Sequence, residues 1–154
     1  MKLGILSKIY RNTGSHGGPN WSEIDKVSDI AVKPTWKEGD GSTRSSRVEK
    51  MAKTMLALEI TGKIRVSNTD ANYIALWQAA HTDDVVDLLV LNGPMNENGV
   101  RGYRADFQVF SAPEDQAMNI VLFMDFTLKP APSDNEPQKV VVSGGAPGYT
   151  DITA

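Results

Sequence analysis

A single short helical segment set among alternating strands most constrains what this 154-residue chain can fold into. The sequence predicts a helix at about 70–82, with Thr69 or Asp70 as its N-cap. Spacings of three and four define its predicted buried face, which consists of Tyr73, Ile74, Trp77, Ala80 and His81. A helix of about three turns is marginal alone in water, so it needs a surface to lie on. We therefore expect a mainly β fold, a β-sandwich or β-barrel with one flanking helix.

Alternation of apolar and polar residues predicts the strands that provide this surface. The clearest strand covers 54–67, where Leu58, Ile60 and Ile64 share the apolar side with Gly62, which would permit a bend or close packing by the helix. The other predicted strands are 21–32, 84–92, 103–110 and 117–129, of which the last two form a β-hairpin. In the first of these the alternation slips by one between Ile24 and Val27, which favours a β-bulge.

Residues 33–50 break all periodicity and are predicted to form a long polar loop. A loop of this length inside a compact domain is usually functional. Because Trp and Arg are enriched at interface hot spots, we expect the loop to be a contact surface. The residues predicted to make this contact are Trp36, Lys37, Arg44, Arg47 and Lys50. The alternative is an ordinary surface loop with Trp36 folded back onto the core.

Composition divides the chain into an N-terminal arm (1–20), a β-sandwich domain (21–129) and a Pro-containing C-terminal arm (130–154). Within the C-terminal arm, 139–142 can add a strand to a sheet edge, either its own or a neighbour's. Residues 1–66 carry 12 Lys/Arg against 7 Asp/Glu, whereas residues 67–154 carry 4 against 12. Opposite potentials on opposite faces would favour head-to-tail association of identical copies, unless the fold mixes both halves.

No catalytic, cofactor or metal site is predicted. The chain has no Cys, and its two His are far apart without metal-ligand spacing. His16 lies in a Gly-rich loop and is expected to be exposed, while Asp83 and Asp84 follow the helix as a solvated turn. We therefore expect a protein that is not an enzyme.

The net charge of −3 argues against a general nucleic-acid binder, which needs a basic patch. No apolar run approaches the roughly 20 residues needed to span a bilayer. The N-terminal apolar run is too short and interrupted for a signal peptide. We expect a soluble protein that is made and folded in the cytoplasm.

The order of these segments resembles that of the tail tube proteins, or major tail proteins, of long-tailed bacteriophages. The resemblance covers 20–143 and contains no invariant catalytic motif. It rests on the strand WSEIDKVSDIAV, the loop EGDGSTRSSR, the helix TDANYIALWQAAHT, the strand DDVVDLLVLNG, the hairpin GYRADFQVFSAPEDQAMNIVLFMDFTLKPA and the C-terminal arm. It implies a β-sandwich-like domain that forms hexameric rings, which stack into a hollow tube through which the genome leaves the virion.

The resemblance also implies partners and a location. The partners are further copies of the chain and other tail proteins, namely the tape measure, the tail tip or baseplate and the terminator. DNA would pass through the lumen without specific binding, and no membrane is involved. The tube would be assembled in the host bacterial cytoplasm and function in the virion tail. The long loop would then reach a neighbouring subunit.

A lumen requires a polar face, and the alternating strands supply one. The candidate lumen-facing residues are Glu59, Thr61, Lys63, Asp106, Gln108, Asn119 and Asp125. Few of them are basic, which suits a conduit, because each neutralised phosphate adds affinity for DNA.

Two alternatives remain open. Tube proteins of type VI secretion systems and contractile bacteriocins share this fold, and the sequence separates them poorly from phage tubes. The other alternative is a monomeric β-sandwich that binds a ligand such as carbohydrate, with Trp21 and Trp36 as stacking platforms.

Overall fold

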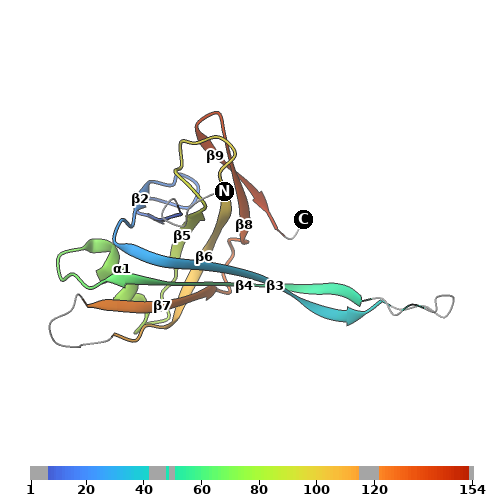
Figure 1. Ribbon diagram of the computed structural model, residues 1–154, viewed down its shortest axis with the longest axis horizontal. Coiled ribbons are helices and arrows are strands. Elements are labelled where there is room, and N and C mark those ends of the chain that lie inside the picture. Colours follow the sequence, from blue (N-terminus) through green and yellow to red (C-terminus); the bar gives the residue numbers. More distant parts are fainter. Residues whose placement is uncertain (1–6, 42–47, 49–50, 115–121, 153–154) are drawn as a thin grey trace.

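A computed structural model describes residues 7–41, 48, 51–114 and 122–152 of the chain. The fold is mainly β with one short helix, as the sequence predicts (Figure 1). In chain order the elements are β1 (Lys8–Asn12), β2 (Trp21–Glu23), β3 (Val27–Asp40), β4 (Met51–Arg65), α1 (Ala71–Ala79), β5 (Val86–Leu91), β6 (Arg101–Ser111), β7 (Phe123–Pro130), β8 (Gln138–Ser143) and β9 (Ala146–Asp151).

The strands form one strongly curled antiparallel sheet, a half-barrel, in the order β2-β1-β5-β6-β7-β4-β3. The sheet forks at β6. One edge of β6 pairs with β5, whereas its other edge pairs first with β8, opposite Arg101 to Arg104, and then with β7, opposite Phe107 to Ser111. The fork sends β8 and β9 in one direction and β7, β4 and β3 in the other (Figure 1).

The core consists of two apolar clusters on opposite faces of the sheet. The larger joins the helix to β1, β4, β5, β6 and β7, and its largest fully buried side chains include Ile60, Ile64, Leu76, Phe107 and Phe126. The smaller lies under β8 and β9 and contains Tyr10, Leu89, Leu91, Val100, Val140 and Val142. Burial on both faces explains the continuous apolar run of β5.

Helix α1 begins where the capping rule places it, but its buried face differs from the prediction. Asp70 is the N-cap, and its Oδ1 accepts a hydrogen bond from the backbone N–H of Asn72 at 3.1 Å. The buried residues are Asn72, Tyr73, Leu76 and Ala79. Ile74 and Trp77 are instead 36% and 44% exposed. The helix is apolar on more than one side, so spacing alone could not select the face that packs.

Strand β4 confirms the predicted alternation and begins earlier, at Met51. Leu58, Ile60 and Ile64 are buried. Gly62 allows close packing as expected, but the partner is Phe126 of the neighbouring strand and not the helix. A Cβ at Gly62 would lie 2.7 Å from the Phe126 ring.

The predicted loop at 33–50 is largely wrong, because β3 continues to Asp40 and β4 starts at Met51. Glu38, Gly39 and Asp40 pair with Lys53, Ala52 and Met51. We call residues 33–40 and 51–57 the hairpin arm, which projects far beyond the body of the molecule in Figure 1. No core covers the outer arm, so its strands lack the apolar alternation from which strands are recognised.

Two further boundaries differ from the prediction. The segment 21–32 divides into β2 and β3, so the slip near Ile24 marks a break between strands. The bulge lies later, between Ser28 and Ala31, where Asp29 has a φ of 54°. β6 and β7 form the expected hairpin, although residues 115–121 lie outside the described part of the chain.

Parts of both expected terminal arms belong to the sheet. β1 lies within 1–20 and pairs with both β2 and β5. At the other end, β8 pairs with β6 and with β9, which confirms that 139–142 adds a strand to the chain's own sheet.

Candidate functional site

The polar face of β3, β4 and β7 carries most of the predicted lumen-facing residues. Lys33 lies opposite Glu59, Thr61 opposite Thr127, Lys63 opposite Asp125, and Gln108 opposite Lys129. Directly opposite residues in an antiparallel pair share a face, so these side chains form one surface. We call it the polar stripe, and none of its side chains is buried. It consists of Lys33, Glu59, Thr61, Lys63, Arg65, Gln108, Asp125, Thr127 and Lys129.

Asp106 does not belong to the polar stripe, although it was a lumen-facing candidate. Only 7% of it is exposed. Its Oδ2 accepts hydrogen bonds from Ser133 Oγ at 2.9 Å and from Asn135 Nδ2 at 3.0 Å. The connection between β7 and β8 therefore covers this part of β6. Asn119, the remaining candidate, lies outside the described residues.

The charge of the polar stripe differs from that of the candidate list. This surface contains four basic residues, Lys33, Lys63, Arg65 and Lys129, and two acidic residues, Glu59 and Asp125. Two pairs of opposite charge are directly across from each other, which favours the paired register. The stripe therefore carries four basic side chains and two acidic ones, although few of the lumen-facing candidates are basic.

The hairpin arm exposes large apolar side chains. Trp36 is 40% exposed and is not folded back onto the core; Lys53 Nζ lies 5.3 Å from its ring centroid. Met51 and Met55 are 51% and 64% exposed. Of the other predicted contact residues, Lys37 lies in β3, while Arg44, Arg47 and Lys50 lie outside the described residues.

A buried polar cluster centred on Arg104 connects both ends of the chain to the sheet, and the sequence prediction missed it. Arg104 is 3% exposed. Its Nε and Nη2 donate to the two carboxylate oxygens of Asp87 at 3.2 and 2.7 Å, a bidentate pair. Its Nη2 also donates to the backbone oxygen of His16 at 2.8 Å. Asn12 Nδ2 donates to Asp87 at 2.9 Å. His16 is thus half-buried and engaged, not simply exposed in a loop.

Two aromatic rings complete the Arg104 cluster. The guanidinium carbon lies 5.0 Å from the Trp21 ring centroid and 4.9 Å from that of Tyr149. Trp21 Nε1 donates to the Tyr149 hydroxyl at 2.9 Å. These contacts occupy Trp21, so it is not a free stacking platform for a ligand. Asp87, a charged residue inside an apolar strand, was the sequence signal that could have revealed this cluster.

The same cluster does not suit a metal ion. His16, Asp87 and Asp106 place one possible ligand atom each within 4.8 Å of one another. However, the Arg104 guanidinium already lies among them and supplies the positive charge that buried carboxylates require. A cation there would be repelled by Arg104.

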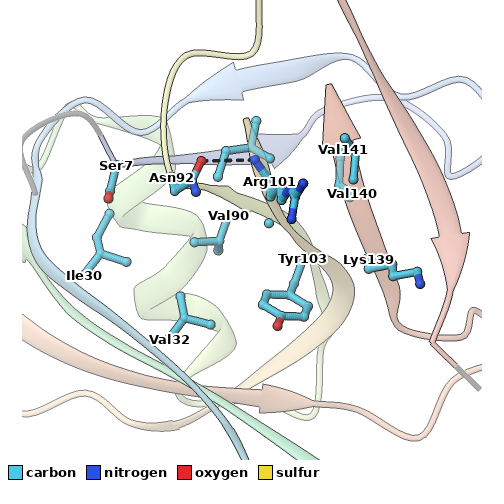
Figure 2. A pocket seen from close by; sticks show the side chains of 12 residues that line it. Ser7, Ile30, Val32, Val90, Asn92, Arg101, Tyr103, Lys139, Val140 and Val141 are labelled. Carbon is cyan, nitrogen blue, oxygen red and sulfur yellow. Dashed lines mark hydrogen bonds between the residues drawn. The ribbon is translucent and has the colours of Figure 1, made fainter. Parts of the chain in front are cut away.

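An apolar groove of about 540 Å³ opens between β3 and the strands β5, β6 and β8 (Figure 2). The apolar side chains that line the groove include Ile30, Val32, Val90, Tyr103 and Val141. Two basic side chains, Arg101 and Lys139, also line it. Among the described residues of this lining, none is a His, Asp, Glu or Cys.

Tyr73 of α1 has a raised pKa. Burial and the hydrogen bond to Glu114 raise the pKa of Tyr73 to about 12. Its hydroxyl donates to Glu114 Oε1 at 2.5 Å and so ties α1 to the segment that follows β6.

Comparison with known proteins adds structural matches only. No family model and no curated protein matches the chain. Among the described residues, no helix is long and apolar enough to cross a membrane.

Several solved structures share the fold, among them the following three. A chain from the tail of an empty gene transfer agent particle, determined with C6 symmetry, matches with a TM-score of 0.68 at 13% identity, over 97% of this chain and 99% of that chain. The SPP1 tail tube matches with a TM-score of 0.68 at 10% identity, over 99% and 82%. The anti-feeding prophage baseplate, sixfold symmetrised, matches with a TM-score of 0.51 at 8% identity, over 89% and 92%. Over nearly its full length, the chain has the fold of tail tube proteins.

Proposed function

We propose that this chain is the structural subunit of a virion tail tube, which self-assembles into stacked hexameric rings around a lumen that conducts the genome. The observation that carries this proposal is the match, over 97% of this chain and 99% of the other, to a tail protein determined with C6 symmetry. Nearly all of both chains is covered by this match, including the terminal strands. Such coverage is expected when two subunits build the same kind of assembly.

In this proposal the polar stripe lines the lumen. Its face is free of the core, and it presents cross-strand pairs of opposite charge such as Lys63 and Asp125. Paired charges limit the phosphate contacts that each Lys can make, so DNA binding stays weak. Glu59, Thr61, Lys63, Gln108 and Asp125 keep their candidate lumen role, and buried Asp106 loses it.

The hairpin arm supplies the contact between subunits. It exposes Trp36, Met51 and Met55, and such side chains are costly to leave in water unless a partner covers them. Lys37 of the predicted contact residues lies on the arm. Other tail proteins (the tape measure, the tail tip or baseplate and the terminator) would contact the ends of the tube, in the virion tail. The tube would be assembled in the cytoplasm of a bacterial host, and its function requires neither catalysis nor a cofactor.

The match to the anti-feeding prophage baseplate supports a second candidate, a related effector-tube or bacteriocin-tube protein. Its lower TM-score of 0.51 ranks it below the first. The monomeric ligand-binding module is disfavoured, because Trp21 is held by Arg104 and Tyr149.

Negative-stain electron microscopy of the purified protein across a concentration series tests the proposal, with light scattering alongside. Hollow rings or stacked tubes with sixfold end views are the expected result. A protein that stays monomeric throughout the series, also in a crowding agent, would contradict self-assembly. Binding of a small glycan by that monomer would favour the ligand-binding module instead.

A further inference from the structure

Seven of the ten large apolar side chains that the described residues expose lie in two places, and the other three are Phe110, Phe123 and Val141. Four lie on or beside the hairpin arm, namely Trp36, Val48, Met51 and Met55. Three lie on α1 and the segment after it, namely Ile74, Trp77 and Val85. We call the second group the helix-end patch; Gln78 borders Ile74 and Trp77 on one side and Val85 on the other.

The two groups lie at opposite ends of the molecule. Figure 1 shows the hairpin arm projecting at one end of the longest axis and α1 at the other. Two different surfaces at opposite ends produce a heterologous, head-to-tail contact, which repeats along the axis.

The two ends also carry opposite charge. The described arm segments, 33–40 and 51–57, contain three Lys and two acidic residues, whereas 68–86 contains three Asp and no Lys or Arg. Asp83 and Asp84, next to the helix-end patch, are exposed, as are Lys37 and Lys53 on the arm. Complementary potentials of this kind steer association and fix its register.

The apolar groove of Figure 2 is a poorer partner for the arm. Arg101 and Lys139 lie on its lining, and both would repel the basic arm. The segment 68–86 contains no Lys or Arg. Arg11 lies beside Gln78 and Val85, but its Nε donates to Asn72 Oδ1 at 2.8 Å.

We propose that the hairpin arm of one copy docks on the helix-end patch of the next copy, with Met51 and Met55 against Trp77 and the arm lysines near Asp83 and Asp84. Methionine side chains adapt to aromatic surfaces and make favourable sulfur contacts with them. This inference rests on the proposed tube function and names the surface through which one ring stacks on the next.

Disulfide trapping tests the contact. Because the chain contains no Cys, only the introduced cysteines can form disulfides. Met51→Cys combined with Gln78→Cys should give a ladder of disulfide-linked oligomers when assembled tubes are oxidised. The matched control combines Met51→Cys with Lys129→Cys, which is exposed on the polar stripe, and should give no ladder. Tubes in which only the control pair crosslinks, or neither pair does, would overturn the inference.

Charge reversal provides the second test. Asp83→Lys with Asp84→Lys should abolish stacking and leave unstacked rings, and Lys37→Glu with Lys53→Glu should do the same. Mixing the two variants restores complementary contacts and should restore tubes. A thermal melt of each variant separates loss of docking from loss of folding.

The two proposals fail differently. If the unmodified protein forms no rings or tubes, the proposed function fails. If it forms tubes and both charge-reversed variants also form them, the tube function stands and only the arm-to-helix contact is wrong.

Discussion

Arg104 is the least exposed of the charged residues that the structure describes, at 3%. Its guanidinium pairs with Asp87 of β5 and contacts Trp21 of β2 and Tyr149 of β9, with His16 beside it. A buried pair of this kind contributes little net stability by itself, but removing one partner leaves an unpaired buried charge. Asp87 depends on Arg104 in this way.

Replacing Arg104 should therefore be strongly destabilising. We expect Arg104→Met to lower the free energy of unfolding by roughly 3–5 kcal/mol, measured by urea denaturation. Arg101→Met, on the exposed start of the same strand, is the control and should change it by less than about 0.5 kcal/mol. Adding Asp87→Asn to Arg104→Met should recover part of the loss. Equal effects of the two Arg substitutions would show that the cluster is not structural.

Tyr73 makes the free energy of unfolding depend on pH in the alkaline range. The pKa of Tyr73 is raised to about 12 by burial and by Glu114, above its usual value of 10.0. Because the folded state favours the neutral phenol, this contribution is complete below pH 10 and is lost as the pH rises towards 12. Urea midpoints measured from pH 8 to 11.5 should fall, and Tyr73→Phe should reduce that fall. Some decline should remain, since burial also raises the pKa of Tyr10. An unchanged pH dependence in Tyr73→Phe would contradict the assignment.

Among the elements, the strands β4 and β6 each contain a glycine that allows close packing, but the neighbours differ. At Gly62 of β4 a Cβ would meet the Phe126 side chain at 2.7 Å, and at Gly102 of β6 it would meet the Val90 carbonyl oxygen at 1.7 Å. A ring can turn or be replaced, whereas the backbone of a paired strand cannot move without breaking the sheet.

Substitution of these two glycines should therefore have distinguishable outcomes. Gly62→Ala should cost about 1–3 kcal/mol of unfolding free energy, as overpacking does, and Phe126→Leu in the same chain should restore part of it. Gly102→Ala should prevent the β5–β6 pairing and give no cooperative unfolding transition. Circular dichroism during thermal and urea unfolding measures both. A stable, cooperative Gly102→Ala variant would refute the backbone argument.

In the molecule as a whole, the strands that alternation could predict from the sequence are those with one buried face and one face in water. β4 was recognised because Leu58 and Ile60 are buried while Lys63 is wet. The outer hairpin arm was missed because no core covers it, so its strands pair without an apolar alternation. Alternation placed Glu59, Thr61, Lys63, Gln108 and Asp125 on a polar face, but it could not show that the distant residues Ser133 and Asn135 bury Asp106. The Arg104 cluster joins residues from both chain ends, a proximity that local periodicity does not contain.

The fork at β6 has a mechanical consequence. One continuous strand carries the β7 side of the sheet at one part of its edge and the β8 side at another. A load applied to either branch therefore reaches the other through this shared strand. Residues 131–137, which join β7 to β8 and are hydrogen-bonded to Asp106, provide a second link, so the two branches resist sliding past one another.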